Sequence, residues 1–307
     1  MKLGVVPARL NSKRLPRKIL ADLNGKPLVA HVMERALEAK SLDKVILAVD
    51  SEETIKTLEQ YDFNMVLTSS DHVSGTDRIA EVIEEIPDAE IIINIQGDEP
   101  LIEADVIDSL VDSFEDSAVD ISTIVSTRLT VSDLLNPNVV KAIVNEHQDA
   151  IEFKRNIFDL EIGGVYRHVG IYGFRRESLI SFTELEPSPR ELESRLEQLR
   201  ALDNGMSIRA TVTNYDSHSV DTQSDLDIVA RIMEMSGVFS DGDNQKDFIV
   251  TGSDISDSPN VQRLKSLGIK ITIGHDKKNI TASELIINSD AIPKDNVCLL
   301  YTSDSAD

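Results

Sequence analysis

The sequence predicts an α/β fold in which a mostly parallel sheet carries helices on both faces and a small, incomplete α/β appendage follows. Short apolar runs typical of buried strands alternate along the chain with longer stretches of helical periodicity. The run at residues 90–95 is apolar almost throughout, which is typical of a strand in a parallel sheet that is covered on both faces. We therefore expect one large sheet-bearing domain over residues 1–235.

The elements follow one another in a regular order. The first strand is expected at residues 3–6, where an apolar run is bounded by Pro7. Further strands are expected at residues 44–49, 65–68, 90–95 and 120–125, and helices at residues 28–39, 52–60, 76–85 and 104–114. Open α/β sheets bind ligands at the edge where the carboxyl ends of parallel strands meet. The loops that follow the strands are therefore the candidates for a functional site.

Composition excludes several classes of protein. The chain of 307 residues has a formal net charge of -23, which argues against nonspecific nucleic-acid binding because such binding needs a basic surface. The single cysteine, Cys298, excludes an internal disulfide framework and a multi-cysteine metal site. No segment approaches the roughly 20 apolar residues of a membrane span, and the stretch before Pro7 is too short for a secretory signal. We expect a cytoplasmic protein without membrane insertion.

A basic loop at residues 7–18 follows the first strand. It carries five cations in an otherwise acidic chain, namely Arg9, Lys13, Arg14, Arg17 and Lys18. Arginine offers forked donors for phosphate oxygens, lysine offers a mobile point charge, and Ser12 adds a hydroxyl and a backbone N–H. A solvated basic turn is the alternative, but loops between a strand and a helix often carry function. We interpret this loop as a cradle for a triphosphate.

Residues 68–78 form a second candidate loop, which leads into a predicted helix. Gly75 and its small neighbours allow close approach of the backbone, and either Ser74 or Thr76 caps the helix. The exposed N–H groups of a helix N-terminus suit a base edge or a phosphate. A plain capped turn fits the same spacing.

Two aspartates are candidates for a metal site. Asp98 follows the buried strand at residues 90–95, where a magnesium ligand beside phosphates is expected, and Gln96 is placed to bond a ribose or sugar hydroxyl. A turn residue that caps the next helix is the alternative for Asp98. Asp221 is either the N-cap of the following helix or a second metal ligand, and the spacing does not separate the two.

These motifs recur with others in a fixed order. The full set is residues 7–9, 12, 14–16, 18, 24–28, 72–78, 96–100, 136–141, 167–174, 187–189, 192–193, 196–202 and 220–222. In this set, residues from Met1 to about Met235 resemble the 3-deoxy-manno-octulosonate cytidylyltransferases of lipopolysaccharide biosynthesis. The resemblance implies a Rossmann-like nucleotidyltransferase sheet and a homodimer. It also implies that CTP and an anionic keto-sugar acid react to a CMP-sugar and pyrophosphate, with magnesium (Mg2+) as the cofactor.

The resemblance also implies roles for single residues. Those implied to bind the triphosphate are Arg9, Ser12, Lys13, Arg14 and Lys18, with Arg9, Arg14 and Lys18 acting in catalysis. Those implied to lie beside the nucleoside are Ser74, Gly75, Thr76, Arg78 and Gln96, and the implied metal ligands are Asp98 and Asp221. Those implied to line the sugar pocket are Arg155, His168, Tyr172, Glu197 and Gln198. A sugar with a carboxylate and several hydroxyls suits such donors and acceptors.

Structural interpretations stay open for four of the sugar-pocket residues. His168 lies in a strand-like stretch and fits a core histidine as well as a ligand. Tyr172 fits simple packing. Glu197 and Gln198 lie in a helix rich in glutamate and arginine, where ion pairs that face solvent are normal.

The chain departs from the family pattern at two places. Arg17 stands where glycine is usual, and the segment around Arg155, before Tyr166, is altered and shortened. These departures leave two alternative functions. One is a cytidylyltransferase for another sugar acid, either a modified octulosonate or a nonulosonate, and the other is a noncatalytic nucleotide-binding protein.

The last part of the chain has a different character. Residues 236–249 are polar and contain glycine, which predicts a linker. Residues 250–296 resemble part of the amino-terminal domain of UDP-N-acetylmuramate–alanine ligase, without the glycine-rich turn that would hold a pyrophosphate. No ligase activity is therefore expected. Residues 297–307 are predicted to be a non-native tail.

Overall fold

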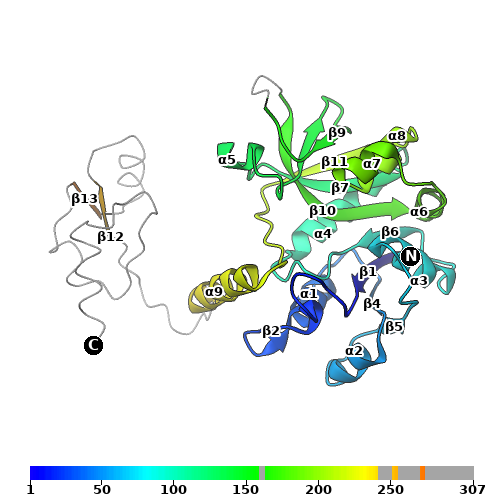
Figure 1. Ribbon diagram of the computed structural model, residues 1–307, viewed down its shortest axis with the longest axis horizontal. Coiled ribbons are helices and arrows are strands. Elements are labelled where there is room, and N and C mark those ends of the chain that lie inside the picture. Colours follow the sequence, from blue (N-terminus) through cyan, green and yellow to red (C-terminus); the bar gives the residue numbers. More distant parts are fainter. Residues whose placement is uncertain (159–162, 241–250, 255–269, 274–307) are drawn as a thin grey trace. The chain divides into compact units, whose positions relative to one another are not determined.

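The structure is a computed structural model that describes residues 1–158, 163–240, 251–254 and 270–273. The chain forms two compact units, Met1–Gly237 and Val238–Asp307 (Figure 1). In the second unit the described elements are β12 (Thr251–Asp254) and β13 (Lys270–Ile273), which pair in parallel. The tail predicted at residues 297–307, and most of the segment predicted at 250–296, lie outside the described residues.

A nine-stranded sheet forms the centre of the first unit, with seven strands in the order β11-β7-β10-β6-β1-β4-β5; β8 pairs with β10, and β9 pairs with β8. The strands are β1 (Lys2–Ala8), β4 (Lys44–Val49), β5 (Met65–Leu67), β6 (Ile91–Asn94), β7 (Ile121–Ser126), β8 (Lys141–Val144), β9 (Ala150–Lys154), β10 (Val165–Arg175) and β11 (Ile208–Thr213). Strand β1 runs parallel to β4 and β6, as do β4 to β5 and β7 to β11. Strand β10 is antiparallel to β6, β7 and β8. The predicted mostly parallel sheet is therefore confirmed.

Helices cover both faces of this sheet, as predicted. Their bounds are α1 (Leu28–Leu37), α2 (Glu52–Thr57), α3 (Gly75–Glu84), α4 (Ala104–Asp112), α5 (Val131–Leu134), α6 (Arg176–Thr183), α7 (Pro189–Ser194), α8 (Gln198–Asp203) and α9 (Gln223–Ser240). The short elements are the 3-10 turns η1 (Lys18–Leu20) and η2 (Ser113–Glu115) and the hairpin of β2 (Asp22–Leu23) and β3 (Lys26–Pro27). Apolar side chains of α1, α4 and α9 pack on one face, and those of α3, α6 and α8 on the other.

The alternation of β1 explains why this strand is apolar on both sides. Leu3 and Val5 belong to the core beneath α3, whereas Val6 and Ala8 belong to the core beneath α1. Successive side chains of a strand point to opposite faces, so a central strand with helices on both faces must be apolar throughout. Burial on both faces is therefore the reason for the short apolar runs from which the strands were predicted.

The predicted end of the first strand is wrong by two residues. The strand continues through Pro7 to Ala8, and its pairing with β4 extends to the Ala8–Val49 pair. Its pairing with β6 stops at Val5 and Asn94. The backbone N–H and C=O groups of Val5 face β6, and the nitrogen of Pro7, two residues further on, faces the same side. The missing N–H of the proline therefore removes no hydrogen bond from the ladder with β4.

Helix α9 runs to Ser240 and so includes residues 236–240, which the sequence predicts to be part of a linker. Val229 and Leu226 anchor its first turns in the core of the first unit. A glycine inside a helix lowers its stability by only about 1 kcal/mol relative to alanine, and residues of high helix propensity beside it, together with a packed apolar face, outweigh this loss. Gly237 therefore did not end the helix.

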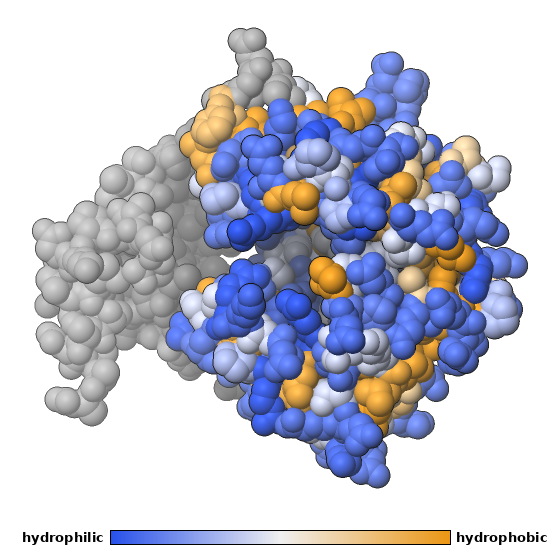
Figure 2. All heavy atoms as spheres, turned by 45° about the vertical axis from the view of Figure 1, so that its right-hand side comes forward, coloured by the Kyte–Doolittle hydropathy of each residue, from blue (hydrophilic) through white to orange (hydrophobic). Residues whose placement is uncertain are grey.

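The surface of the first unit is largely hydrophilic on the face that Figure 2 shows, where a hollow separates two halves. Hydrophilic residues border much of this hollow. Within the described residues, no helix is both long and apolar enough to cross a membrane.

Candidate functional site

A cleft of about 1050 Å³ opens at the carboxyl ends of β1 and β6. Its lining comes from the loops that follow these strands, from the start of α3, from the segment before α9 and from two segments near α5 and α7. Predicted residues in the lining are Arg9, Ser12, Lys13, Arg14, Lys18, Ser74, Gly75, Arg78, Gln96, Asp98, Arg155, Glu197 and Asp221. Tertiary structure therefore gathers most of the residues that the sequence singled out.

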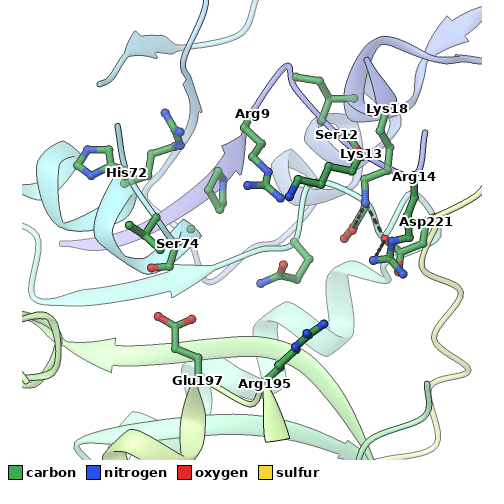
Figure 3. Close-up of a pocket in the computed structure, with 18 of the residues that line it drawn as sticks. Arg9, Ser12, Lys13, Arg14, Lys18, His72, Ser74, Arg195, Glu197 and Asp221 are labelled. Atoms are coloured by element: carbon green, nitrogen blue, oxygen red, sulfur yellow. Dashed lines mark hydrogen bonds and ion pairs between the residues drawn. The ribbon is translucent and has the colours of Figure 1, made fainter. Parts of the chain in front are cut away.

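Lys18 joins the two predicted metal ligands at one end of the cleft (Figure 3). Its Nζ donates to Asp98 Oδ2 at 2.6 Å and to Asp221 Oδ1 at 3.1 Å. The Arg14 guanidinium also contacts Asp221 Oδ1, at 2.8 Å. Burial lowers the pKa of Lys18, but the charges and hydrogen bonds of Asp98 and Asp221 outweigh burial and raise this pKa above its ordinary value. Two carboxylates remote in sequence thus form one cation-binding pair.

The structure decides between the two interpretations of Asp221. Thr222 and Asp225 cap helix α9 reciprocally, since the Asp225 N–H donates to Thr222 Oγ1 at 3.3 Å and the Thr222 N–H donates to Asp225 Oδ2 at 2.8 Å. The cap residue is therefore Thr222, which leaves the carboxylate of Asp221 facing the cleft. A backbone bond from Val220 N–H to the carbonyl of Asp98, at 2.9 Å, holds the two aspartate segments together.

Two glycines let three loops meet at Pro7. A Cβ added at Gly97 would lie 3.0 Å from the Pro7 carbonyl oxygen, and one added at Gly75 would lie 3.2 Å from Pro7 Cγ. Larger residues at these positions would push the loops after β1, β5 and β6 apart. Close approach at the end of β1 is therefore what forms the floor of the cleft.

Four cations of the first loop line one side of the cleft, here called the basic wall: Arg9, Lys13, Arg14 and Lys18. Arg9 and Lys13 make no hydrogen bond or ion pair with any described residue, so they are available to an anion. Strong local positive charge on an acidic protein favours an anionic ligand of high charge density.

Arg17 is not part of the basic wall. Its side chain pairs with Glu53 on α2, and it does not line the cleft. Its backbone is left-handed, with φ 58° and ψ 33°, a conformation that favours glycine. Arginine therefore adopts a turn that suits glycine, and its side chain is directed to Glu53 instead of the cleft.

The start of α3 forms the side of the cleft near Ser74. Ser74 caps the helix in a capping box with Asp77, which decides between Ser74 and Thr76 as the cap. The Thr76 hydroxyl instead donates to Glu197 at 3.2 Å. Arg78 is 3 % exposed and donates to the carbonyl of Ser69 at 3.1 Å, so it holds the loop before α3 in place.

The predicted sugar-pocket residues fall into two groups. Arg155 and Glu197 line the large cleft. Tyr172 and Gln198, together with Glu197, line a separate cavity of about 20 Å³, which has room for one water molecule. Gln198 Nε2 and Glu197 Oε1 are buried without a hydrogen-bond partner among the described residues.

His168 lines neither cavity. Its Nε2 lies 2.9 Å from the Tyr172 hydroxyl and 3.1 Å from Thr123 Oγ1, and its ring packs edge-on against Phe153. Burial lowers the pKa of His168 to about 3, so the ring is neutral at physiological pH. In this structure His168 orients Tyr172 behind the cleft.

Sequence reasoning missed the segments at residues 137–138 and 193–195, which form the side of the cleft opposite the basic wall. Figure 3 shows Arg195 and Glu197 on this opposite wall. Arg195 has φ 54° and ψ 50° at the end of α7. No sequence signal marks Arg195, because its neighbours have the pattern of an ordinary charged helix. The motifs at residues 136–141 and 192–193 belong to the family resemblance, but they carried no functional assignment.

Comparison with known proteins identifies the family. Residues 3–208 match the family model described as cytidylyltransferase. The chain belongs to this family. A 3-deoxy-manno-octulosonate cytidylyltransferase of Chloroherpeton thalassium is 43% identical over 239 residues, covering 75% of this chain and 96% of the relative. One of Lawsonia intracellularis is 40% identical over 238 residues, covering 75% and 93%. These values place the chain among the 3-deoxy-manno-octulosonate cytidylyltransferases and confirm the resemblance that the motifs indicated.

Solved structures agree with this family. A CMP:2-keto-3-deoxy-manno-octonic acid synthetase complexed with CTP has a TM-score of 0.73 and 35% identity, covering 77% of this chain and 100% of that one. A 4-diphosphocytidyl-2C-methyl-D-erythritol synthase of Anaerococcus prevotii, with a TM-score of 0.53 and 14% identity, shares the fold.

A second family model, described as Mur ligase family, catalytic domain, matches residues 244–305. The likeness of the last part of the chain to a muramate ligase is therefore confirmed, although the matching model is that of the catalytic domain and not of the amino-terminal one. The match also includes most of the segment 297–307 that the sequence predicts to be non-native.

Glu99 is a buried acid directly behind the aspartate pair. It is 4 % exposed and accepts from Ser217 Oγ at 2.6 Å and from the Tyr215 hydroxyl at 3.2 Å. Burial above all, together with the charge of Asp98, raises its pKa from 4.5 to about 7, although both hydrogen bonds oppose this rise. The folded protein therefore keeps a proton on Glu99 at pH values where the unfolded chain has lost it.

Replacement of Glu99 by glutamine is expected to reduce the loss of stability at high pH. Because the folded-state pKa is raised, this residue contributes stability below pH 4.5 that is lost as the pH rises toward about 7. The loss is on the order of 3 kcal/mol. Urea unfolding of both proteins at pH 5 and pH 8, with a chelator present, measures it; equal pH dependence in the two proteins would contradict the assignment.

Substitutions of Arg17 test the left-handed turn. Arg17→Gly and Arg17→Ala both remove the exposed ion pair with Glu53, which contributes little. Only glycine adopts a φ of 58° without strain, so the glycine variant is expected to have the higher free energy of unfolding, by about 1 kcal/mol. Equilibrium urea unfolding compares the two, and an alanine variant of equal or greater stability would be the contrary result.

Proposed function

We propose that this protein transfers CMP from CTP to 3-deoxy-D-manno-octulosonate and releases pyrophosphate. The observation that carries the proposal is the junction of Lys18 with Asp98 and Asp221 at the end of the basic wall. A triphosphate needs several cations, and the wall offers the free side chains of Arg9 and Lys13 beside this junction. Family membership and the CTP complex of the similar structure support the same assignment.

The residues at the junction fit a magnesium ion. Mg²⁺ takes oxygen ligands, and sites for nucleotide phosphates commonly supply one or two carboxylates while the phosphates supply the rest. Asp98 and Asp221 already hold one cation, the Lys18 ammonium, between them. Asp98 and Asp221 would hold Mg²⁺, and Lys18 would then be released from them to contact a phosphate oxygen. The ion would supply charge neutralisation at the phosphate groups.

The chain's own residues act by positioning and by neutralising charge. The anomeric hydroxyl oxygen of the sugar forms a bond to the α-phosphorus, and the bond from this phosphorus to the bridging oxygen of pyrophosphate breaks. The hydroxyl proton passes to water, and pyrophosphate leaves with the electron pair. Arg9, Arg14 and Lys18 stabilise negative charge on the phosphates, and the opposite wall holds the sugar. No protein nucleophile is required.

The proposal extends to the setting of the enzyme. We place it in the cytoplasm, where CTP is available, as a step toward lipopolysaccharide, and we propose a homodimer on the strength of the family resemblance.

Pyrophosphate release with CTP, Mg²⁺ and the sugar acid tests the reaction. Turnover with a nonulosonate or a modified octulosonate, but not with 3-deoxy-D-manno-octulosonate, would show that the protein uses another sugar acid as the acceptor of CMP. CTP binding without turnover of any sugar acid would leave a noncatalytic nucleotide-binding protein.

Asp98→Asn and Asp221→Asn are expected to lower kcat by about 100-fold or more, because each removes one carboxylate from the cation-binding pair. Asp227→Asn is the matched control, since Asp227 is an exposed aspartate of α9 that pairs with Gln223 outside the cleft. Circular dichroism and thermal unfolding verify that each variant is folded. Full activity of Asp98→Asn would refute its metal role.

A further inference from the structure

The opposite wall of the cleft is assembled from two segments that are far apart in the sequence. Pro137 and Asn138 precede β8, whereas Glu193, Ser194 and Arg195 end α7. Backbone hydrogen bonds of a helix or sheet do not join these segments. Side chains must therefore hold them together, and two cations do so.

The guanidinium of Arg155 donates hydrogen bonds to backbone carbonyls of both segments. Its Nε donates to the Ser194 carbonyl at 2.7 Å, its Nη1 to that of Pro137 at 2.9 Å and its Nη2 to that of Arg195 at 3.0 Å. All three guanidinium nitrogens are thus engaged, and the planar fork is fixed by its partners. Three of its five N–H groups are thus used, and a ligand carboxylate would find only the two remaining Nη N–H groups, in an orientation that the three bonds fix.

Lys141 supports this arrangement from below. Its side chain is fully buried, and Nζ donates to the carbonyls of Asn136 at 2.9 Å and Val139 at 2.7 Å and also to that of Arg155. Burial lowers the pKa of Lys141, but a lysine that satisfies three carbonyls is a structural anchor. Lys141 and Arg155 together tie residues 136–139 to the end of α7. This explains the motif at residues 136–141, to which the resemblance gave no role.

Arg195 is the other arginine of this wall, and it differs from Arg155 in its exposure and in its hydrogen bonding. It is exposed, and its side chain makes no hydrogen bond or ion pair with any residue in the described part of the chain. Figure 3 shows it across the cleft from Lys13 and Arg14. Its left-handed backbone, with φ 54°, carries a steric cost for arginine, which the bond from Arg155 to its carbonyl helps to offset.

We propose, on the basis of the proposed function, that Arg195 binds the carboxylate of the sugar acid and that Arg155 is a positioning residue that acts through Arg195. The triphosphate occupies the cations of the basic wall, so the carboxylate needs a cation outside that set. The forked donors of Arg195 match a carboxylate. Two residues away, Glu197 lines the same cleft, and its buried Oε1 has no hydrogen-bond partner among the described residues.

Arg195→Gly and Arg195→Lys test the contact. Glycine suits the left-handed backbone, so this variant removes the charge without adding strain. Its KM for the sugar acid is expected to rise about 10- to 100-fold while its KM for CTP stays unchanged. Lysine keeps the charge and loses the fork, and it should give a smaller rise. An unchanged KM for the sugar acid in Arg195→Gly would overturn the inference.

The methyl ester of the sugar acid provides a second readout. The wild-type protein is expected to discriminate against this neutral substrate, and Arg195→Gly is expected to lose most of that discrimination. Undiminished discrimination in the variant would mean that another group binds the carboxylate. Wild-type turnover is measured first, because its absence would contradict the proposed function, whereas turnover that is insensitive to Arg195 would contradict only the inference about this residue.

A double-mutant cycle separates positioning from contact. Arg155→Lys is expected to raise KM for the sugar acid in the wild-type background and to have little further effect in Arg195→Gly, because its action passes through Arg195. Effects that multiply in the double variant would show that Arg155 contacts the sugar itself. Thermal unfolding of both single variants verifies that they are folded.

Discussion

The site depends on one half-buried ionic junction, in which the Lys18 ammonium lies between the carboxylates of Asp98 and Asp221. These groups are 80 and 203 residues from Lys18 in the sequence. Removing charges from water is costly, and only mutual attraction with good geometry compensates for it. The fold therefore has to bring the loops after β1 and β6 and the segment before α9 together accurately. A site for a divalent ion and a triphosphate requires the same accuracy, because its side chains neutralise the phosphate charge only when they lie in contact with the phosphate oxygens or with the ion.

The sheet provides this accuracy through its rigid carboxyl edge. Strand β1 lies between β4 and β6, with apolar helices packed on both faces, so the end of β1 is held from every side. Gly75 and Gly97 then allow neighbouring loops to approach Pro7 closely. The acidity of the whole chain does not oppose anion binding here, because screening limits distant charges while the cations of the basic wall act at contact distance.

The two walls of the cleft are built on different principles. The basic wall presents the free side chains of Arg9 and Lys13 beside Arg14 and Lys18, which are paired with aspartates, and its functional groups are the charges themselves. The opposite wall is held by Lys141 and Arg155, whose side chains donate to backbone carbonyls. Arg155 and Arg195 carry the same side chain and lie in the same cavity lining, yet Arg155 gives three of its five N–H groups to the backbone whereas the side chain of Arg195 has no partner among the described residues. Chemical type alone therefore does not reveal which residue binds a ligand.

The sequence by itself determined the alternating elements, the mostly parallel sheet, the basic loop and the position of Asp98 after a buried strand, because these follow from local apolar patterns and from the position of loops after strands. Tertiary structure decided what depends on distant partners. It placed Thr222 and not Asp221 at the cap of α9, turned Arg17 toward Glu53, set His168 behind Tyr172, and exposed Arg195 in a left-handed turn. In each case the side chain's direction is set by contacts between residues far apart in the chain, and neither composition nor spacing records such contacts.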